Sequence, residues 1–131
     1  MSKTILIVDD SSSLRQVVNL TLTRAGYQVL EAVDGEDALR QLDGRKINLI
    51  VSDVNMPRMD GITFLTRVKQ LPRYKFTPVV MLTTEGQAEK KEQGRAAGAK
   101  AWIVKPFSPQ VLQALLSQTT TAPVLPTKPA T

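Results

Sequence analysis

Three aspartates stand where carboxylates from distant parts of the chain could act together. Asp9 and Asp10 follow the first of five short apolar runs, and Asp53 follows the third. Thr83 comes after the fourth run, and Lys105 after the fifth. In an open α/β sheet, ligands bind beyond the carboxyl ends of the strands. If the runs are parallel strands, we expect three carboxylates, a hydroxyl and an ammonium group to gather at one edge.

Such a cluster favours a divalent cation, because like charges repel strongly in a partly desolvated cleft. The single ammonium group of Lys105 would not neutralise three acids. Mg²⁺ fits best, since it accepts one or two carboxylates together with waters and phosphate oxygens. Such an ion would orient a phosphoryl group for in-line transfer, with Thr83 and Lys105 each holding another of its oxygens.

Each of these residues has an ordinary structural explanation when it is taken alone. A pair of aspartates after a strand is often a helix cap, and a lone aspartate such as Asp53 is usually a turn residue. The prediction of a phosphoryl-transfer site therefore depends on their joint occurrence after four of the five runs.

The composition excludes several kinds of chemistry. The chain of 131 residues has no histidine and no cysteine, so imidazole catalysis, thiolate nucleophiles and disulfides are absent. Its net charge of +5 comes from basic residues spread along the sequence, which we interpret as solvated helix faces and loops. We expect no nucleic-acid partner. No apolar run approaches the roughly 20 residues of a membrane span, so we expect no membrane association and a cytoplasmic protein.

The five apolar runs alternate with segments of helical periodicity, which predicts an α/β fold: a five-stranded parallel sheet with helices on both faces. The runs lie at residues 5–8, 29–33, 49–51, 79–82 and 102–104. Helices are expected within residues 11–26, 38–44, 61–72, 87–97 and 108–116. The second run alternates slightly, so we place it nearer an edge of the sheet. Residues 119–131 are rich in Thr and Pro and are predicted to be a disordered tail after a domain at residues 1–118.

Four motifs in order give a closer comparison: IVDDSSSLR, SDVNMPRMDG, VVMLTTE and AGAKAWIVKPF. Together they resemble the response-regulator receiver family, and most of all its single-domain chemotaxis regulators of the CheY type. The resemblance implies a flavodoxin-like strand order of 2-1-3-4-5 and a signalling switch of a two-component system rather than an enzyme. It implies a sensor histidine kinase as phosphodonor, an effector such as a flagellar motor switch protein, a phosphatase, and a monomeric state.

The resemblance also assigns roles to the clustered residues. It makes Asp53 the phosphorylated aspartate, Asp10 a direct Mg²⁺ ligand and Asp9 a ligand acting largely through water. The backbone carbonyl of Asn55 matches the third protein ligand. Thr83 matches the hydroxyl that moves toward the phosphoryl group, and Lys105 the paired lysine.

Further positions match residues that tune or transmit the switch. Trp102 falls at the switch aromatic position, although a strand tryptophan is more often part of the core or a half-buried cover. Asn55 and Glu85 match regulators that lose their phosphoryl group quickly. Thr84 departs from the Ala or Gly common at its position, and its bulk is expected to restrict access to the acceptor.

Three alternatives stay open. A phosphorelay intermediate would use the same chemistry and pass the phosphoryl group to a histidine phosphotransfer protein. An aspartate-nucleophile phosphatase generally separates its paired acids by one residue, whereas Asp9 and Asp10 are adjacent. A flavin binder could use Ser11–Ser13 as a phosphate loop, but two acids directly before it disfavour bare phosphate.

Overall fold

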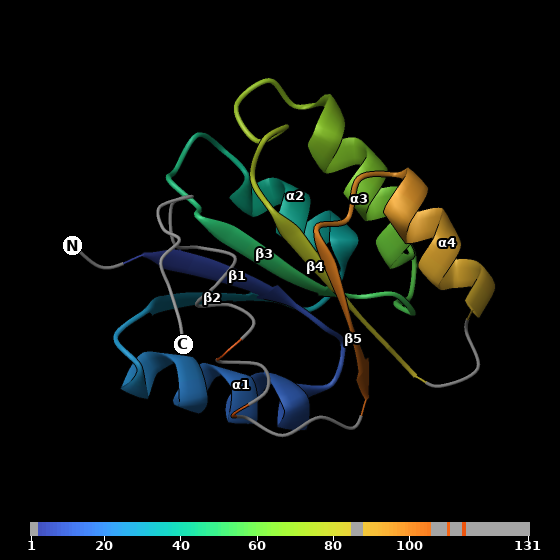
Figure 1. The fold of residues 1–131 in the computed structure, drawn as a ribbon. Coiled ribbons are helices and arrows are strands. Elements are labelled where there is room, and N and C mark those ends of the chain that lie inside the picture. The colour runs from blue at the N-terminus through green and yellow to red at the C-terminus, as the bar shows by residue number, and fades with distance from the viewer. Residues whose placement is uncertain (1–2, 85–87, 106–109, 111–113, 115–131) are drawn as a thin grey trace, which may run out of the picture.

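The computed structural model describes residues 3–84 and 88–105, together with Gln110 and Ala114. The described strands and helices alternate along the chain (Figure 1). They are β1 (Thr4–Val8), α1 (Ser12–Arg24), β2 (Gln28–Ala32), α2 (Gly35–Gln41), β3 (Leu49–Asp53), α3 (Gly61–Gln70), β4 (Val79–Thr84), α4 (Ala88–Ala96) and β5 (Ala101–Lys105).

The strands form one parallel sheet in the order β2-β1-β3-β4-β5, which confirms the predicted order and the edge position of β2. Because β1 lies between β2 and β3, the chain passes from β1 to β2 on one side and then crosses back to form β3 on the other side of β1. This reversal is where ligands bind in doubly wound sheets. The register Val8↔Ser52 brings the carboxyl ends of β1 and β3 side by side.

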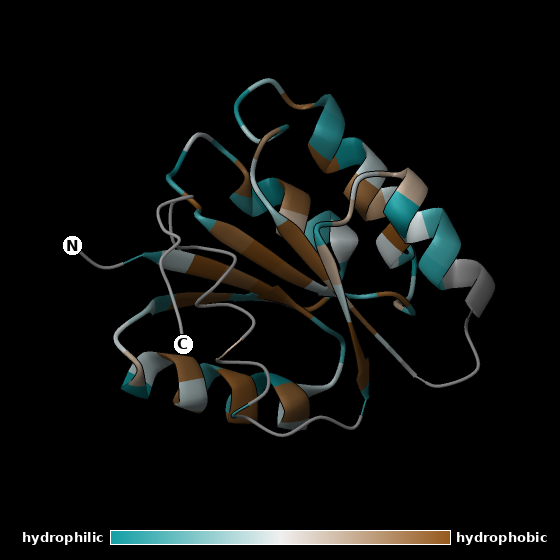
Figure 2. Cartoon of the chain, viewed as in Figure 1, coloured by the Kyte–Doolittle hydropathy of each residue, from teal (hydrophilic) through white to brown (hydrophobic). Residues whose placement is uncertain are grey.

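Alternate strand residues face two separate cores. Leu6 and Val8 belong to the core under α2 and α3, whereas Ile5 and Ile7 belong to the core under α1. Figure 1 shows α1 on one face of the sheet and α2, α3 and α4 on the other. In Figure 2 much of β1, β3 and β4 is coloured as hydrophobic, whereas the edge strand β2 is largely hydrophilic in colour. Burial on both faces explains the nearly continuous apolar runs in the sequence.

The first three helices begin at polar N-cap residues, each of which follows the carboxyl end of a strand. Ser11, Asp34 and Asp60 each accept a hydrogen bond from the backbone N–H three residues further on, at the starts of α1, α2 and α3. The polar segment predicted as a helix at residues 87–97 forms α4. In the described part of the chain, no helix has the length and apolarity needed to cross a bilayer.

Two predictions fall largely or wholly outside the described residues. Of the helix expected at residues 108–116, only Gln110 and Ala114 are described, and both are helical. The tail predicted at residues 119–131 lies wholly outside them.

Gly61 is the first residue of α3 and touches the end of β3 directly. A Cβ atom added there would lie 2.1 Å from the carbonyl oxygen of Asp53 and 2.8 Å from the Cα of Val54. Both neighbours are backbone atoms that cannot move aside, so only glycine lets α3 begin this close to Asp53.

We therefore predict that Gly61→Ala lowers the free energy of unfolding by about 2 kcal/mol or more, as measured by urea denaturation. Gly35→Ala is the matched control, because its added Cβ would meet only the flexible side chain of Met59. The free energy of unfolding of this control should fall clearly less than that of Gly61→Ala. Equal stability of Gly61→Ala and the unaltered protein would contradict the close contact.

Candidate functional site

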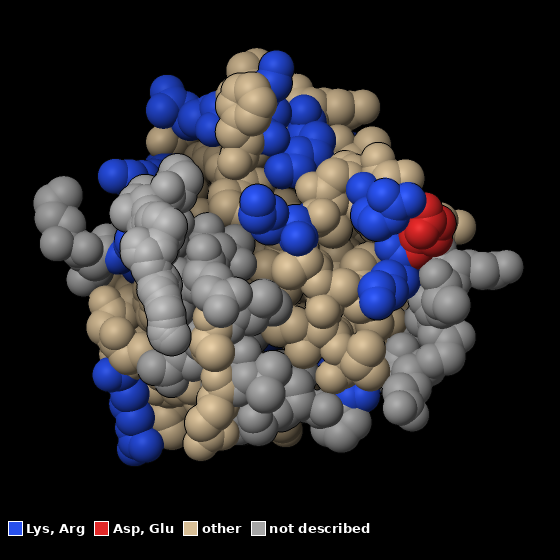
Figure 3. Space-filling model, viewed as in Figure 1, with Lys and Arg blue, Asp and Glu red and all other residues tan. Residues whose placement is uncertain are grey.

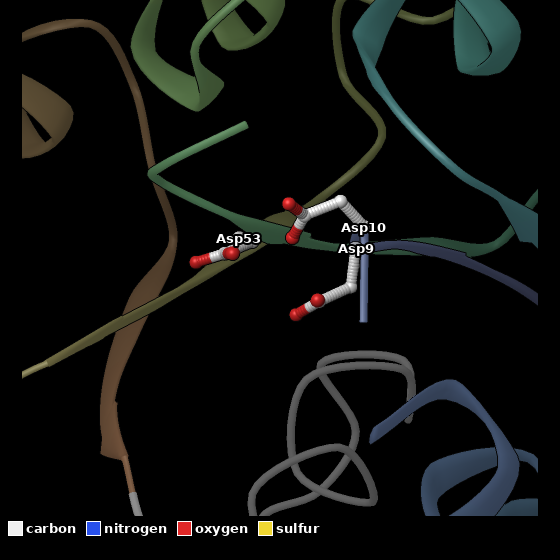
Figure 4. Close-up of side chains that lie close together, drawn as sticks. All are labelled: Asp9, Asp10 and Asp53. Carbon is white, nitrogen blue, oxygen red and sulfur yellow. The ribbon is translucent and has the colours of Figure 1, made fainter. Parts of the chain in front are cut away.

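The three aspartates singled out in the sequence come together at the carboxyl edge of the sheet (Figure 4). Carboxylate oxygens of Asp9, Asp10 and Asp53 all lie within 4.8 Å of one another. Asp9 and Asp10 follow β1 directly, and Asp53 is the last residue of the neighbouring β3. Asp9 is fully buried, Asp53 is 6% exposed and Asp10 is exposed.

Lys105 reaches this cluster from the end of β5. Its Nζ lies 3.1 Å from Oδ2 of Asp9 and 3.4 Å from Oδ1 of Asp53. One ammonium group leaves the three carboxylates with an excess of negative charge. The donors are oxygens only, a set that suits a hard divalent cation such as Mg²⁺ and not a softer metal. The residues present therefore fit the predicted ion.

The two adjacent aspartates differ in how far their oxygens are already engaged. One oxygen of Asp9 accepts the backbone N–H of Ser11 at 2.8 Å, and the other pairs with Lys105. Asp10 makes no hydrogen bond or ion pair with another described residue. The Asp10 carboxylate is thus the more available of the two for an ion.

The electrostatics of Asp53 reflect its surroundings. Burial raises the pKa of its carboxyl, and the neighbouring Asp9 raises it further. Lys105 acts in the opposite direction, as does the Asn55 backbone N–H, which donates to Asp53 Oδ1 at 3.4 Å. In the folded protein the ionised form of Asp53 is therefore disfavoured unless more positive charge arrives.

The structure also places two of the remaining predicted residues, Thr83 and Asn55. Thr83 is buried at the end of β4, which pairs with β3 on one side and β5 on the other. Asn55 lies two residues beyond Asp53, in the connection to α3. Glu85 lies outside the described residues, and so does the side chain of Thr84.

Trp102 lies on β5 and packs against α4. A Cβ atom added at Gly94 would lie 2.1 Å from Cζ3 of the indole ring, so the ring rests directly on the backbone of the helix. The half-buried ring also borders the core under α2 and α3. Its Nε1 is buried and has no hydrogen-bond partner among the described residues. A buried N–H without a partner is costly, so this ring position carries a desolvation cost.

An ion pair that the sequence did not indicate holds the loop after Asp53. The guanidinium of Arg58 pairs with the buried carboxylate of Asp34, and lies 3.7 Å from Glu36. Arg58 is the only described residue other than glycine with a positive φ, 66°. The backbone N–H of Asp37, and then Arg58, lower the pKa of Asp34. The loop that carries Asn55 is thereby tied to the start of α2.

The sequence matches the family model of the response regulator receiver domain over residues 5–117. The chain belongs to this family. The receiver domain is 41% identical over 111 residues to the chemotaxis protein CheY1 of Helicobacter pylori, covering 83% of this chain and 90% of that protein. It is 40% identical to the CheY homolog of Campylobacter jejuni, covering 83% and 85%.

Solved structures agree with the assignment. The structure of the chemotaxis response regulator CheY4 of Vibrio cholerae superimposes on the receiver domain with a TM-score of 0.86. The two are 47% identical, and the match covers 91% of this chain and 99% of that one. The receiver domain thus has a CheY-like fold and belongs to two-component signalling, with an acidic cluster compatible with Mg²⁺.

The raised pKa of Asp53 has a measurable consequence without metal. The folded state binds its proton more readily than the unfolded state, so the stability it contributes is present below the ordinary pKa of 3.8 and is lost as pH rises. At neutral pH without metal, Asp53→Asn should therefore raise the unfolding midpoint by a few degrees, the shift that about 1 kcal/mol produces in a domain of this size. Thermal denaturation with a chelator present measures it.

The gain should shrink as the pH falls toward the ordinary pKa of the aspartate. Asp43→Asn serves as the control, because that exposed carboxyl has its pKa lowered by Arg45 and should gain no stability when neutralised. Equal behaviour of the two variants, or a loss of stability in Asp53→Asn at neutral pH, would contradict the repulsion inferred at the site.

Proposed function

We propose that this receiver domain is a phosphorylation-activated switch in which Asp53 accepts the phosphoryl group. The observation that carries the proposal is the placement of Asp53, buried at the end of β3, beside two further carboxylates and 3.4 Å from Lys105. A nucleophilic carboxylate, a cation to meet the phosphoryl oxygens and donors for a divalent ion are what acyl-phosphate formation requires.

The phosphoryl donor is a phosphohistidine on a partner kinase, since this chain has no histidine of its own. An oxygen of the ionised Asp53 carboxylate attacks the phosphorus in line. The bond from phosphorus to the imidazole nitrogen breaks, its electron pair stays on that nitrogen, and Asp53 becomes an acyl phosphate. Lys105 favours the ionised form of Asp53 before transfer and pairs with a phosphoryl oxygen afterwards.

Mg²⁺ would be held by the carboxylates of Asp10 and Asp53 and by the backbone carbonyl of Asn55, with Asp9 acting mainly through water. The carboxylate of Asp10, which no other described residue engages, and the engaged oxygens of Asp9 support this division. When bound, the ion neutralises negative charge on the carboxylates and the phosphoryl oxygens.

The acyl phosphate adds charge and acceptor oxygens at the carboxyl edge of the sheet. Thr83 hydrogen-bonds one of these oxygens, and the space that it leaves lets Trp102 change position. The indole N–H, which has no partner in the described part of the chain, supports a change of ring position, and the close contact with Gly94 would couple that change to α4. A shift of a few kcal/mol between two such states would change the affinity for an effector.

Asn55 and Glu85 would set how long the phosphoryl group lasts, and Thr84 would set how easily water or a phosphatase reaches it.

The pathway that we propose is chemotaxis in the cytoplasm, because the similar CheY1 and CheY4 proteins are chemotaxis proteins by name. The partners would be a sensor histidine kinase, a flagellar motor switch protein as effector, and a phosphatase. Transfer of the phosphoryl group onward to a histidine phosphotransfer protein, in place of a change in effector binding, would make the domain a relay intermediate.

Acetyl phosphate provides the direct test of the acceptor. With Mg²⁺ present, we expect mass spectrometry to find one labile phosphoryl adduct at Asp53, together with a change in the fluorescence of Trp102, the only tryptophan. Asp53→Ala should show neither change, whereas Asp43→Asn, at an exposed acid outside the cluster, should behave like the unaltered protein. An adduct on another residue, or a fluorescence response that persists in Asp53→Ala, would overturn the proposal.

A further inference from the structure

The end of the sheet opposite Asp53 carries a surface that the switch does not use. It is formed by the connections that lead into β3 and β4, residues 42–48 and 71–78. Arg45, Lys46 and Arg73 line one pocket of about 310 Å³ there, and a second pocket of about 260 Å³ adjoins it. The two pockets share Gly44, Arg73 and Tyr74 in their walls.

The two connections are fixed to each other, so this surface is preformed. The hydroxyl of the buried Tyr74 accepts the backbone N–H of Gly44 at 2.9 Å and donates to the carbonyl of Arg45 at 2.7 Å. The ammonium group of Lys69 donates to the carbonyls of Lys75 and Thr77. A preformed surface loses little conformational entropy when a ligand binds.

The surface is strongly basic. Its four exposed cations come from two segments of the sequence: Arg45, Lys46, Arg73 and Lys75. The only acid in these two connections is Asp43, and it is already paired with Arg45. Lys46 and Arg73 make no ion pair with a described residue. Figure 3 shows Lys and Arg side chains gathered at the top of the molecule, over the loops that precede β3 and β4.

Apolar groups accompany these charges. Phe76 is 87% exposed, the most exposed of the large hydrophobic residues described, and the ammonium group of Lys75 lies 5.2 Å from the centre of its ring. Apolar side chains also line the pockets: Leu42, Ile47, Leu71 and Pro72. An exposed aromatic residue and partly apolar pockets beside exposed cations are typical of a protein-binding surface.

We propose that this basic edge (Arg45, Lys46, Arg73, Lys75 and Phe76) binds an acidic segment of a partner protein that also presents an apolar side chain. It binds this segment whether or not Asp53 is phosphorylated, because it lies at the opposite ends of the strands and is held by Tyr74. Such a contact would keep the switch near its partners in both states and would leave the carboxyl edge and α4 free.

Other occupants fit the observations less well. A bilayer would bury a single aromatic side chain, which gives only weak membrane binding, and would leave the pockets unfilled. The apolar side chains in the pocket walls would find no partner in the phosphates of a nucleic acid. Residues 106–131 of this chain contain no Asp or Glu and offer no complementary charge. At the carboxyl edge of a second copy, Asp9 and Asp53 are buried and paired with Lys105, and the exposed Asp10 belongs to the proposed Mg²⁺ site.

A phage-displayed library of random peptides, selected on the immobilised protein, tests the proposal. We expect enriched peptides that combine Asp or Glu with an apolar residue. Fluorescence anisotropy on the free peptides should show binding weakened about tenfold by the double variant Lys46→Glu/Arg73→Glu, the loss expected when two exposed charge pairs become repulsive. Phe76→Ala should also weaken it, and acetyl phosphate with Mg²⁺ should leave it unchanged.

The matched control is Arg24→Glu/Arg67→Glu, which makes the same change of net charge on exposed faces of α1 and α3. If this control weakens binding as much, if no peptide is enriched, or if every enriched peptide ignores the basic-edge variants, the proposal is overturned. It is also overturned if vesicles containing phosphatidylserine or a single-stranded oligonucleotide bind as tightly with the same dependence on Lys46 and Arg73. Concentration-dependent self-association that Lys46→Glu/Arg73→Glu abolishes would assign the surface to a second copy instead. The alanine pair Lys46→Ala/Arg73→Ala repeats the test with less perturbation of folding.

Discussion

Repulsion among the carboxylates of Asp9, Asp10 and Asp53 is the constraint around which the carboxyl edge of the sheet is organised. Two of the three are almost completely removed from water, where like charges interact strongly, and Lys105 offsets only part of the excess. The fold tolerates this arrangement because the aspartates lie at the ends of two strands that are buried and hydrogen-bonded on both sides. The residual negative charge prepares the site for a cation and disfavours a free phosphate.

The rest of the structure positions this charge and connects it to the elements of the proposed switch. The neighbouring strands β1 and β3 place the acids together, and Gly61 lets α3 begin against the backbone of Asp53. The Arg58–Asp34 pair fixes the loop between β3 and α3. On the far side of β4, Trp102 rests on Gly94, and its N–H finds no partner among the residues that the structure describes. The acid cluster and this ring are the two ends of the proposed switch, and β4 with Thr83 lies between them. The basic edge lies at the other ends of the strands, so our two proposals assign different tasks to the two ends of one sheet.

Much of this was predictable from the sequence, because it depends on periodicity and on the residue types that come directly after each strand. The alternating runs predict the sheet, and the positions of Asp9, Asp10, Asp53 and Lys105 at the ends of their runs predict the cluster. The Arg58–Asp34 pair was not predictable, since it depends on a positive φ at a residue that rarely adopts one. The contact of Trp102 with Gly94 was not predictable either, because the feature that permits it is the missing side chain of a glycine. The basic edge was missed because its cations look scattered along the sequence until the fold brings residues 42–48 and 71–78 together.

The measurement that tests the account most directly is a Mg²⁺ titration monitored by thermal denaturation of the unaltered protein and of Asp10→Asn. We predict that the unfolding midpoint of the unaltered protein rises steadily with Mg²⁺ concentration, as for any ligand that binds the folded state alone. In Asp10→Asn, which has one carboxylate fewer, the rise should be much smaller. An unaltered protein whose midpoint does not respond to Mg²⁺ would show that the clustered charges need no cation, and would contradict the account.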